Sequence, residues 1–322
     1  MDLRCMRSGA EFVAFVSVTL GLGWVLLACA LAAFCATASA QSTPTALREE
    51  VLMLRKPGFF SLEIEATLFR PPGEGPHRLL VINHGKAPGD PRFQPRARYT
   101  LVARELVERG YAVVIPMRQG FSKSSGAYIG GGCNVGSNGL AQADDVQFVL
   151  DALGQRADID VRRVVVIGQS HGGLTTLAIG TLKLPNVVGL VNFAGGLRND
   201  SCPGWEGTLA RAVGDYASDT VIPSLWFYGD NDSYFPPRIW QEMHLRYTER
   251  GGRARLIAFG SFGSDAHALF GGRAGWSIWL PEVERFFREL NLPFDKQDAI
   301  GRIDHELPAR SVVDDGVARS AR

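Results

Sequence analysis

The run from Val164 to Gly173 constrains the fold of this chain more than any other stretch. Residues 164–167 are apolar and mostly β-branched, which is typical of a strand buried on both faces of a parallel sheet. A Gly-x-Ser-x-Gly pattern follows directly at 168–172, and the apolar residues after it can continue as a helix. Strand, sharp turn and helix together expose the serine, and the turn needs small neighbours because backbones pass closely there. We therefore expect Ser170 to be a nucleophile at the carboxyl end of a strand.

Strand-like and helix-like segments alternate along the rest of the chain. Alternation of this kind predicts an α/β fold of parallel βαβ units, with the functional site outside the carboxyl ends of the strands. A strand is expected over 62–69, where residues 62–68 alternate strictly between apolar and polar, which predicts an antiparallel strand with one wet face. The other expected strands are 49–56, 79–83, 112–115, 187–193, 224–228 and 254–259, and the expected helices are 99–109, 140–153, 238–250 and 276–290.

The first forty residues are predicted to be a signal peptide. Arg4 and Arg7 give a positive start, the run 12–34 is apolar and uncharged, and small residues at 38–40 match a cleavage site. The alternative is an uncleaved membrane anchor, because the apolar run is long enough to span a bilayer. Cleavage would give an exported protein, periplasmic or secreted, with no stable membrane partner.

Composition sets the size and general class of the mature chain. The 322 residues are 46% hydrophobic and 21% charged, with a formal net charge of +1. That composition is ordinary for a globular protein, and the small net charge gives no reason to expect a nucleic-acid partner. We expect one catalytic domain over 41–290, followed by a polar C-terminal tail over 291–322.

The cysteine count predicts one disulfide. Of five cysteines, three lie in the predicted signal peptide, which leaves Cys133 and Cys202. Export to an oxidising compartment favours a bridge between them, which would close a long loop and contribute about 4 kcal/mol in the chain-entropy account. The alternative is two unrelated free thiols.

Two aspartates follow the strand expected at 224–228. Asp230 and Asp232 both lie at its carboxyl end. A serine hydroxyl needs a base, the base needs an acid to orient it, and in an α/β arrangement the acid follows the nucleophile in the chain. Asp230 fits the turn itself, since such side chains bond their own backbone, so we favour Asp232 as the acid. The alternative is that both aspartates only shape the turn.

Six histidines are candidates for the base. His267 lies in a loop between the last strand and the last helix, downstream of Asp232, and this order fits a nucleophile–acid–base arrangement. We therefore expect His267 to be the base. The other five are expected to have no catalytic role. His77 should lie in a loop before the third strand, and His84 should brace the loop after that strand. His171 should lie beside the serine but point elsewhere, His244 should lie on a helix surface and His305 in the tail.

Backbone amides are expected to bind the oxyanion. One should belong to His171, the residue after the nucleophile, and another to the loop after the third strand. In that loop we expect the amide of Lys86, with Gly85 as second choice. The alternative is that Gly85 only permits a tight turn.

Together these motifs resemble the α/β-hydrolase superfamily, and within it the dienelactone-hydrolase-like and prolyl-oligopeptidase-like serine esterases. The resemblance spans about 49–290. It implies a mostly parallel sheet of about eight strands with helices on both faces, and hydrolysis through an acyl-enzyme without cofactor or metal. The motifs that carry it are Asn83-His84-Gly85-Lys86, Arg118-Gln119-Gly120-Phe121-Ser122, Gly168-Gln169-Ser170-His171-Gly172, Gly229 with Asp232, and Asp265-Ala266-His267.

The resemblance also places the less regular parts of the chain. The insertion over 195–219 would be a small lid above the serine, and a bridge between Cys133 and Cys202 would fix it at the rim. Dienelactone hydrolases proper use a cysteine nucleophile, whereas this chain has a serine at that position. Four aromatic residues are candidates for the substrate pocket: Phe121, Trp205, Tyr234 and Phe235.

The function expected from the sequence is hydrolysis of a small-molecule carboxylic ester by an exported serine hydrolase. Ser170 would attack, His267 would move the proton and Asp232 would orient His267. One alternative is a serine peptidase or amidase with the same machinery. Another is a catalytically silent binding protein on this fold, although no member of the expected triad is missing.

Overall fold

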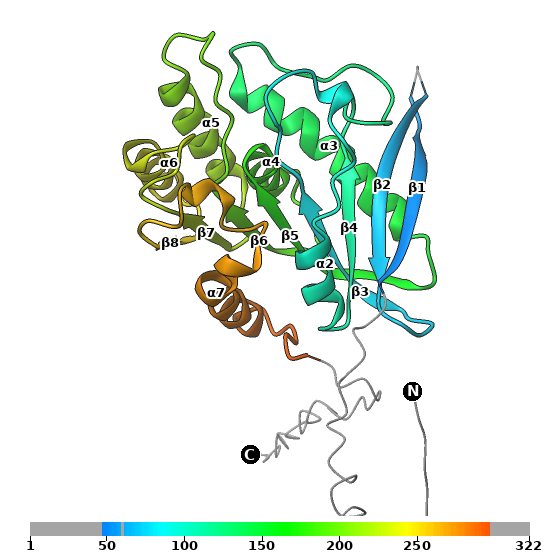
Figure 1. Ribbon diagram of the computed structural model, residues 1–322. Coiled ribbons are helices and arrows are strands. Elements are labelled where there is room, and N and C mark those ends of the chain that lie inside the picture. The colour runs from blue at the N-terminus through cyan, green and yellow to red at the C-terminus, as the bar shows by residue number, and fades with distance from the viewer. Residues whose placement is uncertain (1–46, 59–60, 297–322) are drawn as a thin grey trace, which may run out of the picture. The chain divides into compact units, whose positions relative to one another are not determined.

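The computed structural model describes residues 47–58 and 61–296 (Figure 1). The predicted signal peptide lies outside these residues, as does most of the predicted C-terminal tail.

An eight-stranded, mostly parallel sheet forms the centre of the described region. The pairs β1–β2 and β2–β4 are antiparallel, and every pair from β4 onward across the sheet is parallel. This confirms the expected fold class. In spatial order the strands are β1 (Arg48–Lys56), β2 (Leu62–Arg70), β4 (Tyr111–Met117), β3 (His77–Asn83), β5 (Ile159–Gln169), β6 (Val187–Phe193), β7 (Ser224–Tyr228) and β8 (Ala254–Ala258).

Helices cover both faces of the sheet and make a three-layer arrangement (Figure 1). One core contains side chains of α2 (Thr100–Val107) and α7 (Trp276–Glu289). The core on the opposite face contains side chains of α3 (Val135–Leu153), α4 (His171–Ile179), α5 (Trp205–Asp219) and α6 (Pro237–Glu249). Because both faces are covered, the central strand β5 is apolar at Val164, Val165 and Val166, all fully buried.

The antiparallel pairing expected for β2 is confirmed, but its predicted wet face is exposed only at Glu63. Glu65 and Thr67 point to the side that should have been exposed, yet both are buried. Arg96 covers them: its Nη1 donates to Thr67 Oγ1 at 2.6 Å, and its Nε lies 3.9 Å from a Glu65 carboxylate oxygen. A charged partner from another loop thus allows polar residues to be buried in this strand.

Helix α3 begins five residues earlier than the sequence indicated. Asn134 caps it, since its side-chain oxygen accepts a hydrogen bond from the Ser137 amide at 3.0 Å. The added turn brings Asn138 into the buried part of the helix.

The segment expected as an irregular lid is largely regular. Residues Trp205–Asp219 form α5, whose buried side chains, including Leu209 and Val213, belong to the core between sheet and helices. Only the loop over 194–204 is irregular. The predicted insertion is therefore mostly the crossover helix between β6 and β7.

The domain also continues past its expected end at residue 290. Leu292 and Phe294 are both only 5% exposed, and the Phe294 ring lies 4.7 Å from that of Phe287. The hydroxyl of Tyr111 donates to the carbonyl of Pro293 at 2.5 Å. The chain therefore packs against the core beyond the start of the predicted polar tail.

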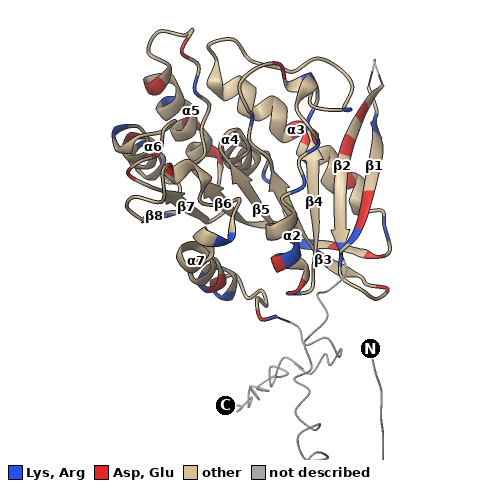
Figure 2. Cartoon of the chain, viewed as in Figure 1, with Lys and Arg blue, Asp and Glu red and all other residues tan. Residues whose placement is uncertain are grey.

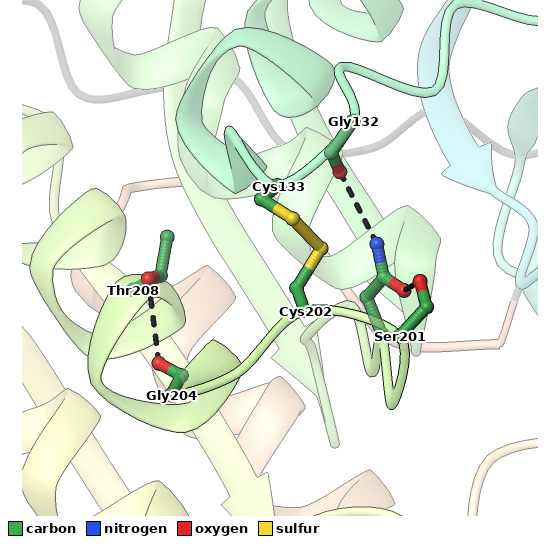
Figure 3. The surroundings of a disulfide bond; sticks show 7 residues. Gly132, Cys133, Ser201, Cys202, Gly204 and Thr208 are labelled. Carbon is green, nitrogen blue, oxygen red and sulfur yellow. Dashed lines mark hydrogen bonds between the residues drawn. A yellow bond between two sulfur atoms is a disulfide. The ribbon is translucent and has the colours of Figure 1, made fainter.

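A disulfide joins Cys133 to Cys202, 69 residues apart in sequence, which is the pairing expected from the sequence (Figure 3). It connects the segment before α3 to the loop after β6. Beside it, the Asn199 side chain donates to the carbonyl of Gly132 at 3.2 Å. Closure of a loop of this length stabilises the folded state by about 4 kcal/mol in the chain-entropy account.

Charged side chains of both signs are interspersed on the outer elements. Figure 2 shows this along β1, β2, α6 and α7. Within residues 47–58 and 61–296, no helix is both long enough and apolar enough to cross a membrane.

Candidate active site

Ser170 occupies a strained turn between β5 and α4. Its φ of 56° and ψ of −125° lie outside the usual regions for a residue with a side chain, which is a common feature of functional turns. Two glycines make the turn possible. A Cβ at Gly168 would lie 2.1 Å from the Gly172 carbonyl oxygen, and one at Gly172 would lie 2.0 Å from the carbonyl oxygen of Asn83. Close packing of β5, α4 and β3 therefore dictates the glycines on either side of the serine.

Backbone hydrogen bonds hold the serine in this conformation. Its N–H donates to the Phe193 carbonyl at 3.0 Å, and its carbonyl accepts from the amides of Gly173 at 2.8 Å and Gly196 at 3.0 Å. The turn is thus fixed to the neighbouring strand β6 and to the loop that follows it.

The structure brings Asp232 and His267 together. Asp232 follows β7, and His267 lies in a short 3-10 helix, η3 (Ala266–Ala268), between β8 and α7. The Nδ1 atom of His267 lies 3.0 and 3.1 Å from the two carboxylate oxygens of Asp232. The Asp232 side chain is fully buried, and its Oδ1 also accepts from the amides of Tyr234 and Phe235 at 2.8 and 2.9 Å. These two amides orient the carboxylate toward the imidazole.

Asp230, the other candidate acid, is exposed and has no contact with His267 among the described interactions. Its amide donates to the carbonyl of Gly260 at 2.8 Å, as expected of a turn residue.

A further aspartate, which the sequence indicated only as part of the motif that ends in His267, joins the acid and base loops. Asp265 caps η3 by accepting from the His267 amide at 2.9 Å. The same carboxylate accepts from the Ser233 amide at 3.1 Å and from its hydroxyl at 2.6 Å. Its position two residues before the histidine was the available signal, because Asp is favoured at caps.

Ser170 and His267 line one cavity of about 460 Å³. Phe121 and Tyr234 also line it, as two of the four aromatic candidates. The remaining lining residues are His84, Gly85, Lys86, Ala87, Pro88, Gln94, Pro95, Ala97, Arg98, Tyr99, Met117 and Gln169.

The other two aromatic candidates, Trp205 and Phe235, are not part of this lining. Phe235 is 1% exposed and packs against Trp205, with ring centres 6.5 Å apart. A Cβ at Gly196 would lie 2.6 Å from the Phe235 ring, so that ring fills the space beneath the loop after β6. Both residues therefore belong to the core behind the acid loop and do not form the cavity wall.

The loop after β3 lies directly against the nucleophile. A Cβ at Gly85 would be 3.3 Å from the Cβ of Ser170. The Gly85 amide donates to the Tyr99 hydroxyl at 3.3 Å. In the described part of the chain, the amides of Lys86 and His171 donate to no protein acceptor. The backbone amides of Lys86 and His171 are therefore available to a ligand, whereas that of Gly85 is bonded to Tyr99.

Two further histidines near the serine belong to a buried polar cluster. His171 Nδ1 lies 3.1 Å from an Arg118 nitrogen, and His171 Nε2 lies 2.6 Å from Asn138 Oδ1. Arg118 also donates to the His84 carbonyl at 2.8 Å. Burial, together with the charge of Arg118, holds the pKa of both His84 and His171 well below the ordinary value. Both rings are therefore uncharged at neutral pH. Of these two histidines and His267, only His267 contacts a carboxylate that can orient it, which makes it the base candidate.

Arg118 contacts two residues next to the serine, His84 and His171. The sequence indicated this arginine only as the first residue of a motif and assigned it no role. It is fully buried, and burial lowers its pKa to about 10, so it remains charged at neutral pH. The available signal was an arginine placed directly after a strand as apolar as β4.

No group of three or more His, Cys, Asp or Glu side chains suited to a metal ion occurs among the described residues.

A hydrolase family model matches part of the chain. The sequence model of the family described as serine aminopeptidase, S33, matches residues 75–227, a range that includes Ser170 and the strands around it. No curated protein matches the chain.

Solved structures share the fold at low sequence identity. A puromycin-hydrolyzing peptidase of Mycobacterium tuberculosis is 19% identical with a TM-score of 0.57. The match covers 80% of this chain and 42% of that peptidase, so this chain spans less than half the length of that relative. A putative dienelactone hydrolase of Klebsiella pneumoniae is 18% identical over 76% of this chain and 99% of its own, with a TM-score of 0.55. A Pyrococcus furiosus esterase is 14% identical over 76% and 90%, with a TM-score of 0.54.

The two neighbouring aspartates provide a matched test of the acid. Asp232→Asn should lower kcat on the order of 10³–10⁴-fold with a small change in KM, because an amide stabilises the wrong tautomer of His267. Asp230→Asn removes an equal charge two residues away and should leave kcat unchanged. Steady-state kinetics on any accepted substrate measures both. Equal losses in the two variants, or none in Asp232→Asn, would contradict the assignment.

Proposed function

We propose that this chain, a serine hydrolase of the α/β-hydrolase superfamily, cleaves carboxylic esters of small molecules through an acyl-enzyme intermediate. The observation that carries the proposal is the contact between His267 and the buried Asp232. His267 and Ser170 line the same cavity. A serine hydroxyl is a weak nucleophile, and an oriented imidazole is the group that activates it.

The proposed reaction has two halves. Ser170 Oγ attacks the ester carbonyl carbon while His267 Nε2 takes its proton, and Asp232 stabilises the resulting imidazolium. The carbonyl oxygen becomes an oxyanion held by the amides of Lys86 and His171. Collapse of this intermediate breaks the bond to the alcohol, which leaves with the proton from His267. Water then attacks the acyl-enzyme by the same route and releases the acid and free Ser170.

The cavity supports a small-molecule substrate. A volume of about 460 Å³ lies in the range typical of pockets for small ligands. Met117 and Phe121 are buried in its wall and offer an apolar surface to an acyl or alkyl group.

A serine peptidase or amidase is the second candidate, and the family match favours it. The S33 family is described as serine aminopeptidase, and one structural neighbour is a peptidase. An amine is a poorer leaving group than an alcohol, so an amidase needs firmer protonation of the leaving nitrogen by its histidine.

A substrate panel separates the two candidates. With p-nitrophenyl esters of increasing acyl length and aminoacyl p-nitroanilides as matched chromogenic substrates, we expect kcat/KM to be higher for the esters. All ester hydrolysis should be lost in Ser170→Ala. A higher kcat/KM for the anilides would replace the ester proposal with the peptidase one, and ester hydrolysis retained by Ser170→Ala would overturn both.

We also propose that the protein is exported and that its signal peptide is removed. The positive start, apolar run and small residues of 1–40 support this, and so does the disulfide, since such bonds persist in oxidising compartments.

The mature protein provides the test of export. Purified from the exported fraction of its host, it should have an intact mass corresponding to a start at Gln41. Thiol titration under denaturing conditions should find no free thiol before reduction and two after it. A membrane-bound chain that keeps residues 1–40 would favour the anchor instead, and two thiols before reduction would exclude the bridge.

A further inference from the structure

A chain of three hydrogen bonds joins four residues that line the cavity, two of which the catalytic scheme does not use. The Gly85 amide donates to the Tyr99 hydroxyl at 3.3 Å, and that hydroxyl donates to Gln169 Oε1 at 3.0 Å. Gln169 Nε2 then donates to the His267 carbonyl at 2.9 Å. The chain therefore links the loop after β3, the serine turn after β5 and the histidine loop after β8.

The chemistry of the four groups gives this chain one direction. A backbone N–H can only donate, so the Tyr99 oxygen accepts from Gly85 and directs its own proton to another acceptor. At the far end a backbone carbonyl can only accept, so Gln169 must present its NH₂ to His267 and its oxygen to Tyr99. Each of the three bonds pairs a donor with an acceptor, and bonds aligned in this way strengthen one another.

Tyr99 makes this contact from a strained backbone conformation. Its φ is 42°, a left-handed conformation that residues with side chains rarely adopt, and it precedes helix α2 without a side-chain cap. Such a conformation is strained and persists only where surrounding contacts impose it. The Tyr99 ring packs against Phe270, with centres 5.5 Å apart, so it also touches the segment that follows His267.

Gln169 occupies the variable position of the Gly-x-Ser-x-Gly turn, directly before the nucleophile. Its side chain lines the cavity together with Tyr99, and it reaches the histidine loop without contacting the imidazole itself. Acting on the backbone of His267, it adds to the constraint that Asp232 and Asp265 place on the same residue.

We propose that Tyr99 and Gln169 are positioning residues that hold the oxyanion loop and the base loop at a fixed geometry around Ser170. By engaging the Gly85 amide, Tyr99 sets the direction of the next peptide, and so of the Lys86 amide that binds the oxyanion. By holding the His267 carbonyl, Gln169 sets the distance of the base from the serine. This inference rests on the proposed function, because it assigns the two residues to the same reaction.

The expected effect is on the transition state. Without the Tyr99 hydroxyl the cavity walls stay in place, so substrate binding changes little. The oxyanion donor loses its fixed direction, and small misplacements of such groups reduce rates strongly. KM should therefore stay nearly constant while kcat falls.

Tyr99→Phe is the primary variant, with Gln169→Glu as the second. Glutamate keeps an acceptor for Tyr99 but loses the donor to the His267 carbonyl. We expect about a tenfold lower kcat for p-nitrophenyl esters in each, with KM within about twofold of the parent. The rate of Ser170 modification by a fluorophosphonate should fall by a similar factor. The double variant should be little slower than either single one, because the residues act as one unit.

Tyr111→Phe is the matched control. It also removes a tyrosine hydroxyl, one that donates a hydrogen bond to the Pro293 carbonyl, and Tyr111 is not among the residues that line the cavity. It should lower the melting temperature but leave kcat unchanged. A variant that only destabilises the fold is therefore distinguished from Tyr99→Phe by its unchanged kcat.

The outcomes separate this inference from the proposed function. If the parent protein hydrolyses no ester, the proposed function is overturned. The role of Tyr99 is then still decided by comparing the rates at which the fluorophosphonate modifies Ser170 in the parent and in Tyr99→Phe. Rates for Tyr99→Phe and Gln169→Glu within about twofold of the parent would overturn the inference, as would effects that multiply in the double variant. If Tyr99→Phe fails to fold, the result for Gln169→Glu decides.

Discussion

The close packing of β5, α4 and β3 around the serine turn is the constraint on which the rest of the site depends. No side chain fits at Gly168 or Gly172, because each would meet a backbone carbonyl at about 2 Å. This contact forces Ser170 into its unusual backbone conformation and directs its side chain into the cavity. It also brings the end of β3, and with it the loop that carries Lys86, against the nucleophile.

Parallel strands supply the remaining groups at the same edge of the sheet. In the proposed mechanism, the loop after β3 contributes the Lys86 amide, and the turn after β5 contributes Ser170 and the His171 amide. The loops after β7 and β8 contribute the proposed acid and base. Polar side chains then fix these loops to one another. Asp265 joins the acid and base loops, and Tyr99 with Gln169 joins the oxyanion, serine and base loops. The buried Arg118 supports the oxyanion loop from beneath through the His84 carbonyl.

The sequence predicted the features that depend on local pattern and chain order. The buried run before Ser170, the strand before Asp232 and the loop around His267 could be recognised because periodicity and turn residues specify them. Features that depend on distant partners could not be recognised. Arg96 makes the burial of Glu65 possible, and nothing near the glutamate indicates it. In the same way, the link between Tyr99 and Gln169 spans 70 residues and exists only in the folded chain.

The central claim is that Ser170 is the activated nucleophile of this cavity. Its most direct test is reaction of the purified protein with a fluorophosphonate, followed by peptide mass spectrometry to locate the modified residue. The account predicts one adduct per chain, on Ser170 in the peptide that contains Gly168 to Gly172, and none after heat denaturation. A different modified residue, or an unmodified Ser170 in folded protein, would contradict it.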